Sequence, residues 1–153
     1  YYLLKKNCSG LAHTLIREKF VLIGLECATK KEVLETMGKL ICNEGFVSFE
    51  YINSVLRRES MSSTYFRNNV ALPHGMPSFV NKSVIIFAVL KKEMHWDKNG
   101  NSAQLICMPA VKSEDVDAIN KLFKILKQKE KVEKLLAIQK QAEFVELIRK
   151  AYE

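Results

Sequence analysis

The reactive side chains of this sequence gather in one polar segment, residues 57–75, and His74 is the side chain there that is best suited to chemistry. Pro73 restricts the backbone before the histidine, and Gly75 leaves the backbone free after it, so a loop can aim the imidazole in one direction. Histidine offers an unprotonated nucleophilic nitrogen at neutral pH without help from a separate base. The pattern makes His74 a candidate catalytic nucleophile.

A lone histidine in a loop is more often an ordinary polar residue, so composition and spacing alone leave this assignment open. The other histidines, His13 and His95, belong to no cluster. His13 falls on an expected helix near the N-terminus, and His95 follows an expected strand. Both are predicted to be surface residues without a catalytic role.

Further motifs surround His74 in a fixed order: Arg58-Glu59, then Ser63-Thr64, then Val70-Ala71-Leu72-Pro73-His74-Gly75. This order resembles the active-site signature of the fructose/mannitol-type (type 2) enzyme IIA domains of the bacterial phosphoenolpyruvate:sugar phosphotransferase system. The resemblance extends over nearly the whole chain, which is interpreted as one such domain, residues 1–153.

The resemblance implies that His74 accepts a phosphoryl group from the phosphocarrier protein HPr on its Nε2 nitrogen. It also implies that Arg58, with Ser63 and Thr64 nearby, holds the phosphoryl oxygens. A guanidinium fork suits these oxygens better than an ammonium group does, and phosphoryl transfer depends mainly on positioning. The domain would then be a phosphoryl carrier rather than a turnover enzyme, with no metal or other cofactor expected.

The sequence departs from the transport members of that family at two places. Tyr65, Arg67 and Asn69 stand where glycine-rich spacing is common, and residues 116–120 lack the second histidine that many transport members carry. These departures are similar to the enzyme IIA-like domains at the C-termini of transcription regulators and antiterminators. The favoured hypothesis is therefore a regulatory domain whose upstream DNA- or RNA-binding module lies in the same polypeptide. The alternative is a transport enzyme IIA that passes the group to a sugar-specific IIB domain.

The elements that must position this segment follow from the hydrophobic pattern. Residues 20–25 predict a buried strand, and Thr29 and Glu32 form a capping box that begins a helix ending before Gly45. A second helix begins after Ser48 and carries Arg57, Arg58 and Glu59 at its C-terminal end, and residues 60–77 are expected to be polar loop. Strands are predicted over 84–90 and 104–108, joined by a turn at 97–101, and helices over 113–127, 131–138 and 143–152. This order predicts an α/β fold: a mixed β-sheet flanked by helices on both faces, in a single layered domain.

Composition excludes several other classes of protein. The chain has 153 residues, 48% of them hydrophobic, which is enough apolar mass for one sizeable core. Its 24 Lys+Arg and 17 Asp+Glu give a net charge of +7, but the lysines of the C-terminal third recur at helical spacing opposite apolar residues, as on a solvated helix face. Direct nucleic-acid binding is therefore not favoured. A purely structural docking module is not favoured either, because the motif Pro73-His74-Gly75 argues against it.

Cysteines and hydropathy point to a reduced compartment. The cysteines, Cys8, Cys27, Cys42 and Cys107, form no C-x-x-C pair or zinc-ligand spacing, and they are expected to be free thiols. No apolar run approaches the roughly 20 residues of a membrane span, and the start does not read as a signal peptide. A cytoplasmic location without membrane insertion is expected. The first residue is not Met, which suits a piece of a longer polypeptide.

Overall fold

The computed structural model describes residues 12–152, which form a mixed β-sheet with helices on both of its faces. The sheet has five strands in the order β1-β4-β5-β3-β2. Their bounds are β1 Ile16–Leu25, β2 Tyr65–Arg67, β3 Val70–Ala71, β4 Val84–His95 and β5 Ser102–Ala110. The predicted fold class is confirmed.

Strand direction makes the chain leave β3 toward the end of β5, the strand that lies between β3 and β4. β4 and β5 form an antiparallel hairpin whose register pairs Val84 with Ala110 and Phe87 with Cys107, as the turn at residues 97–101 predicts. β1 runs parallel to β4, and β3 runs parallel to β5. The chain leaving β3 at Ala71 therefore continues toward the edge of the sheet where β5 ends and β4 begins.

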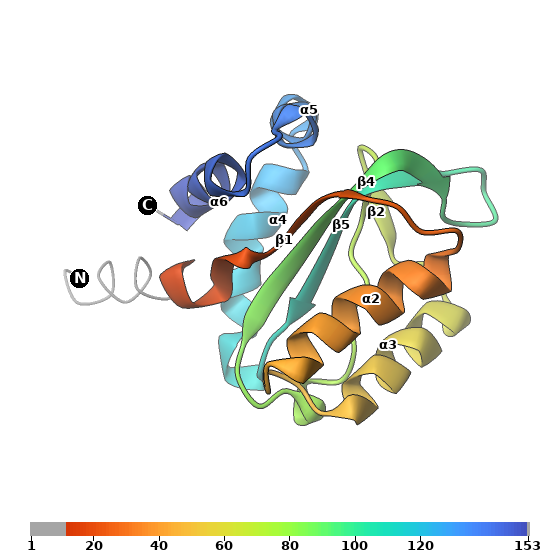
Figure 1. Cartoon of the computed structure of the whole chain (residues 1–153), viewed down its shortest axis with the longest axis vertical. Coiled ribbons are helices and arrows are strands. Elements are labelled where there is room, and N and C mark those ends of the chain that lie inside the picture. Colours follow the sequence, from red (N-terminus) through yellow and green to blue (C-terminus); the bar gives the residue numbers. More distant parts are fainter. Residues whose placement is uncertain (1–11, 153) are drawn as a thin grey trace.

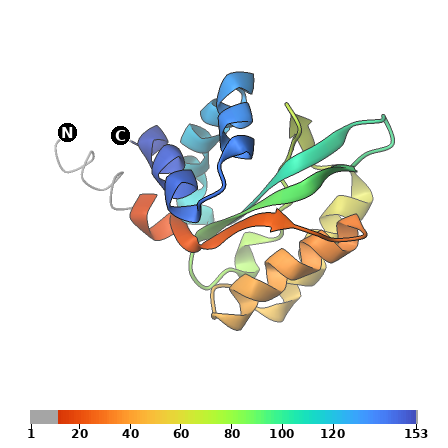
Figure 2. The same cartoon turned by 45° about the horizontal axis from the view of Figure 1, so that its top comes forward.

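Two helices, α2 (Lys30–Asn43) and α3 (Phe49–Met61), lie side by side on one face of the sheet (Figures 1 and 2). The predicted cap of α2 is confirmed, because the Thr29 hydroxyl accepts a hydrogen bond from the Glu32 backbone N–H at 3.1 Å. Gly45 follows the helix with φ +82°, the left-handed conformation expected there. Ser48 occupies the N-cap position of α3, but its hydroxyl makes no capping hydrogen bond.

The other face carries α4 (Ile119–Leu126), α5 (Lys129–Ala137) and α6 (Gln141–Arg149) (Figure 2). The sequence predicts one continuous helix over 113–127, and this is wrong at its start, where Ser113–Ala118 is a 3₁₀-helix. The Asp115 carboxylate accepts a hydrogen bond from the Ser83 hydroxyl at 2.6 Å, which ties this turn to the start of β4. Val116, which lies in this turn, is exposed.

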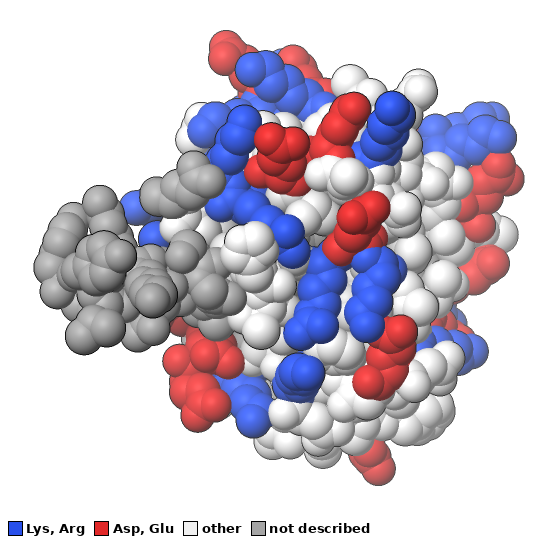
Figure 3. Space-filling view, turned by 60° about the vertical axis from the view of Figure 1, so that its left-hand side comes forward, with Lys and Arg blue, Asp and Glu red and all other residues white. Residues whose placement is uncertain are grey.

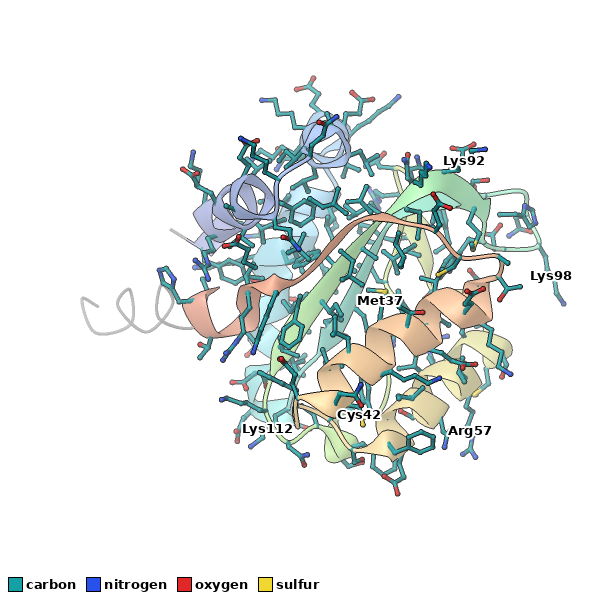
Figure 4. All side chains as sticks on the ribbon, viewed as in Figure 1. Met37, Cys42, Arg57, Lys92, Lys98 and Lys112 are labelled. Atoms are coloured by element: carbon teal, nitrogen blue, oxygen red, sulfur yellow. The ribbon has the colours of Figure 1, made fainter. Side chains whose placement is uncertain are left out.

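The hydrophobic core lies on both sides of β4, which explains why its sequence shows an unbroken apolar run. Ile85, Phe87 and Val89 pack with the C-terminal helices. Val84, Ile86, Ala88 and Leu90 pack on the opposite side with α2 and α3, where Figure 4 shows Met37 between α2 and the sheet.

The surface mixes charges of both signs. Of the lysines that helical spacing predicts to be solvated, Lys124, Lys127, Lys131 and Lys134 are exposed, whereas Lys121 is half-buried. On the face shown in Figure 3, acidic side chains lie between the basic ones. In the part of the chain that the structure describes, no helix has the length and apolarity that crossing a membrane requires.

Candidate functional site

His74 lies in the loop that follows β3 and is half-buried. Its Nδ1 atom is 2.9 Å from the carbonyl oxygen of Leu72. A carbonyl oxygen only accepts hydrogen bonds, so Nδ1 must carry the proton in this contact. In a neutral imidazole the other nitrogen, Nε2, then keeps its lone pair. The backbone thus favours the tautomer in which Nε2 carries the free lone pair.

One face of α3 holds the loop in this position. The backbone N–H of Gly75 donates to the Tyr51 hydroxyl at 3.1 Å, and the N–H of Met76 donates to the Ser54 hydroxyl at 3.0 Å. Tyr51 in turn donates to the Pro109 carbonyl at 3.2 Å, which links the loop to the end of β5. Burial raises the pKa of the Tyr51 hydroxyl above its ordinary value, so the hydroxyl remains a donor.

Gly75 is required here by close packing rather than by an unusual φ. A Cβ on this residue would lie 2.8 Å from the Tyr51 ring and would also collide with the Ser54 hydroxyl. The absence of a side chain therefore lets the residue after His74 approach α3, which is a role that the sequence signal Pro73-His74-Gly75 cannot distinguish from flexibility.

Arg58 belongs to the same face of α3, because it follows Tyr51 by seven residues and Ser54 by four. Its side chain is half-buried, and its Nη1 donates to the Ser62 carbonyl at 2.6 Å. A groove of about 440 Å³ between α3 and the segment after His74 is lined by both Arg58 and Met76. The structure therefore brings Arg58 to the side of α3 that supports the histidine loop.

Arg57 is the more exposed arginine of the pair, as expected, and Figure 4 shows it directed away from the sheet. It borders the same groove. Within that groove the exposed side chains of Met61 and Met76 add apolar surface.

Ser63 and Thr64 have different surroundings. Ser63 is exposed, and its hydroxyl accepts a hydrogen bond from the Tyr65 N–H at 3.1 Å. Thr64 is buried, and its hydroxyl donates to the carboxylate of Glu59. The Thr64 side chain is therefore turned toward α3, whereas Ser63 faces solvent.

Glu59 belongs to the Arg58-Glu59 motif, but the sequence assigns it no role of its own. In the structure it is 9% exposed and forms an ion pair with Lys30 at 2.5 Å. Helical spacing indicates that Glu59 lies on the buried face of α3, because it follows the buried Ile52 and Val55 by seven and four residues. A carboxylate on the buried face of a helix needs hydrogen-bond or ion-pair partners.

The segment between Thr64 and His74 contains the short strands β2 and β3, where a loop was expected. Asn68 and Asn69 turn the chain between them with φ of 53° and 71°, so asparagines take the left-handed positions that glycine would otherwise fill. The Asn68 amide also donates to the Leu126 and Lys127 carbonyls at the end of α4. The hairpin is thus fixed on both sides despite its bulky residues.

No other histidine joins His74 within the part of the chain that the structure describes. His13 and His95 are both exposed, as predicted. Residues 116–120, which lead into α4, contain no histidine.

No group of at least three His, Cys, Asp or Glu side chains in residues 12–152 is arranged to hold a metal ion. Cys27, Cys42 and Cys107 are free thiols, while Cys8 lies outside the described residues. Burial raises the pKa of the Cys107 thiol, which is typical of an unreactive core cysteine.

Comparison with known proteins places this geometry in context. Residues 14–151 match the family described as phosphoenolpyruvate-dependent sugar phosphotransferase system, EIIA 2. The chain is 28% identical over 115 residues to the probable licABCH operon regulator of Bacillus subtilis, covering 75% of this chain and 18% of the regulator. It is 26% identical over 133 residues to the mannitol-specific phosphotransferase enzyme IIA component of Halalkalibacterium halodurans, covering 84% of this chain and 90% of that protein.

The fold is similar to that of solved enzyme IIA structures. The crystal structure of the mannitol enzyme IIA of Escherichia coli superposes with a TM-score of 0.77 at 25% identity, over 86% of this chain and 97% of the other. The same Escherichia coli domain in its complex with phosphorylated mannitol enzyme IIB gives a TM-score of 0.78 at 24% identity, over 86% of this chain and 95% of the other. The chain spans about a fifth of the length of the regulator and of the PTS system mannitol-specific EIICBA component of Buchnera aphidicola, and 90% of the Halalkalibacterium halodurans protein.

Proposed function

We propose that this chain, which belongs to the EIIA 2 family of the phosphoenolpyruvate-dependent sugar phosphotransferase system, receives a phosphoryl group from HPr on Nε2 of His74. The observation that carries the proposal is the 2.9 Å contact between Nδ1 of His74 and the Leu72 carbonyl. It leaves Nε2 unprotonated, and an unprotonated nitrogen is what a phosphoryl acceptor needs.

The transfer step balances without a separate base. The Nε2 lone pair forms a bond to phosphorus, and the bond from phosphorus to the donor breaks with its electron pair remaining on the donor. The proton on Nδ1 stays in place, so the ring gains positive charge as the new bond forms. The Leu72 carbonyl oxygen, already hydrogen-bonded to that proton, stabilises this charge.

Arg58 and Ser63 are proposed to hold the phosphoryl oxygens. Arg58 lies on the face of α3 that supports residues 75 and 76, and its guanidinium has further N–H groups beyond the one used on Ser62. Ser63 is exposed, with a hydroxyl proton to donate. The Thr64 hydroxyl is engaged with Glu59, so for Thr64 the proposal is one of positioning rather than of direct phosphate contact.

We propose further that the domain is regulatory: phosphorylation of His74 reports sugar supply to a DNA- or RNA-binding module of the same polypeptide in the cytoplasm. The absence of histidine from residues 116–120 supports this role, as does the similarity to the licABCH operon regulator. A transport role, with onward transfer to a sugar-specific IIB domain, is the second candidate. Its support is the match to a mannitol enzyme IIA component over 90% of that protein.

The test of phosphoryl acceptance is incubation with phosphoenolpyruvate, enzyme I and HPr, followed by measurement of the intact mass. One added phosphoryl group that is lost in acid is expected, since phosphohistidine is labile there. Omission of HPr is the control and should leave the mass unchanged. An unmodified mass in the complete mixture would refute the proposal.

A further inference from the structure

A buried ion-pair network connects α2, α3 and the hairpin β2–β3 behind the histidine loop. Its centre is the Glu59 carboxylate, whose side chain is 5% exposed. Oε1 pairs with Lys30 Nζ at 2.5 Å and accepts the Thr64 N–H at 3.1 Å, while Oε2 accepts the Thr64 hydroxyl. Both carboxylate oxygens are therefore occupied, as a buried charge requires.

Lys30 is also held by Trp96. Its ammonium group also donates to the Trp96 carbonyl at 2.9 Å and lies 4.8 Å from the centre of the Trp96 ring. Trp96 is buried and follows β4 directly, so the cation is anchored to the central hairpin of the sheet. The position of the Glu59 carboxylate is consequently set by both α3 and the sheet.

From Glu59, hydrogen bonds run without a break to His74. Thr64, held by the carboxylate, accepts the Leu72 N–H on its carbonyl oxygen at 2.9 Å. Leu72 then accepts the Nδ1 proton of His74 on its own carbonyl oxygen at 2.9 Å. Each bond fixes the residue that makes the next one, so the carboxylate on α3 controls the acceptor that faces the imidazole.

On the side of β2, short strands give Leu72 little support, whereas β5 pairs with β3 on the other side. β2 has three residues and β3 has two, and their pairing is irregular between Tyr65 and Arg67. A ladder of this length supplies few hydrogen bonds, and β2 is the outer strand of the sheet. The side-chain anchor on Thr64 supplies the constraint that a longer strand pair would provide.

We propose that Glu59 is a positioning residue for phosphoryl transfer, acting with Lys30 and Thr64 to hold the Leu72 carbonyl where it selects the Nδ1-protonated tautomer of His74. This inference rests on the proposed function of His74 as the phosphoryl acceptor. A merely structural role for Glu59 predicts lower stability with an unchanged tautomer, so the tautomer is the readout that separates the two roles.

The test compares Glu59→Gln with Glu35→Gln in the full chain. Glu35 is a matched control, because its carboxylate also pairs with lysines, Lys31 and Lys39, at 3.7 Å, and both of these lie on its own helix α2. Two quantities are measured for each protein: the rate of phosphorylation by phosphorylated HPr, and the ¹⁵N spectrum of the His74 ring in alkaline buffer, where histidine side chains are neutral.

We expect the wild type and Glu35→Gln to show Nδ1–H as the main tautomer and to be phosphorylated at equal rates. In Glu59→Gln the Nε2–H tautomer should gain population, and the rate should fall about tenfold or more, as for other residues that orient a reacting histidine. Unchanged tautomer populations in a folded Glu59→Gln protein would overturn the inference, whatever its rate.

Thr64 provides a second variant in case Glu59→Gln does not fold. Thr64→Val removes the hydroxyl hydrogen bond to Glu59 but keeps the backbone N–H hydrogen bond. The tautomer shift should therefore be smaller than in Glu59→Gln. Thr64→Ser keeps a hydroxyl and should show the wild-type spectrum. Equal spectra for Thr64→Val and Thr64→Ser would contradict the inference. If the wild type accepts no phosphoryl group, the proposed function fails, while the ¹⁵N spectra still decide the positioning role.

Discussion

The carbonyl oxygen of Leu72 lies 2.9 Å from Nδ1 of His74, two residues further along the chain. Because Pro73 stands between them with a restricted φ, this distance is set by the backbone of the loop itself. The contact holds a proton on Nδ1 and leaves the lone pair on the other ring nitrogen. The reactivity of the imidazole thus depends on backbone geometry near the end of β3.

The first prediction is that His74 is the sole phosphoryl acceptor. His74→Ala should abolish labelling from phosphorylated HPr, measured by intact mass, because no other described histidine lies in a supporting loop. His13→Ala and His95→Ala are the controls and should retain full labelling, since both side chains are exposed and far outside the signature. Labelling that persists in His74→Ala would refute the assignment.

The second prediction concerns the guanidinium of Arg58. Arg58→Lys keeps the charge but loses the fork that can contact several phosphoryl oxygens, so phosphorylation should slow by about tenfold or more, as expected for a charge-assisted hydrogen bond of about 1.5–3 kcal/mol. The free energy of unfolding should change by less than about 1 kcal/mol, because the side chain is half-buried at a helix end.

Arg57→Lys is the matched control for Arg58, since Arg57 is the exposed neighbour on the same helix turn. The rate at which phosphorylated HPr phosphorylates Arg57→Lys, measured beside that of Arg58→Lys, should equal the rate for the wild type. Equal rates for the wild type and Arg58→Lys would remove Arg58 from the site.

The sequence predicts those parts of the fold that local patterns determine. The apolar runs of β1, β4 and β5, the Thr29 cap and the Asp97 turn are all confirmed, because each depends on residues close together in the chain. β2 and β3 are missed, since segments of three and two residues carry no periodicity and form only by pairing with each other and with the distant strand β5.

For the candidate site, too, the sequence predicts only what depends on residues close together in the chain. His74 and Arg58 could be proposed as site residues from the sequence, because each belongs to a short contiguous motif. The network around Glu59 could not, because it joins Lys30, Glu59 and Trp96, which are distant in sequence and meet only after folding. The helical spacing of Glu59 from Ile52 and Val55 does indicate that it is buried. A charged residue near a helix end is nevertheless normally expected to be exposed.

The third prediction uses the buried hydroxyl of Tyr51. Tyr51→Phe leaves the Gly75 N–H and the Pro109 carbonyl without their partner, so urea unfolding should show a loss of about 1–3 kcal/mol. Tyr152→Phe is the control, because the Tyr152 hydroxyl is also buried but has no hydrogen-bond partner among the described residues. Tyr152→Phe should lower the free energy of unfolding little or not at all. A loss for Tyr51→Phe no larger than that for Tyr152→Phe would contradict the role of Tyr51 in holding the loop.

The fourth prediction concerns alkaline pH. Burial raises the pKa of both Tyr51 and Tyr152, so above the ordinary tyrosine pKa of about 10 the unfolded chain releases protons that the folded chain retains. The free energy of unfolding should therefore be unaffected by these groups at neutral pH and fall as the pH rises past about 10. Tyr51→Phe and Tyr152→Phe should each make this fall shallower in unfolding measurements, and an unchanged slope in both variants would contradict the burial argument.

The last prediction separates a regulatory domain from a transport component. If a second histidine in the stretch leading into α4 assists departure of the phosphoryl group in transport members, this chain, which has none at residues 116–120, should discharge slowly. The phosphorylated protein, freed of its donor, would be mixed with a panel of fructose- and mannitol-type IIB domains, and the decay of phosphohistidine would be compared with decay in buffer. We expect similar decay in both, because a sensor requires a phosphorylated state that persists. Introducing the histidine by Ala118→His gives a matched variant, and it should accelerate discharge to at least one IIB domain if that position faces the phosphoryl group. Rapid, stoichiometric discharge of the wild type to any IIB domain would instead favour the transport role.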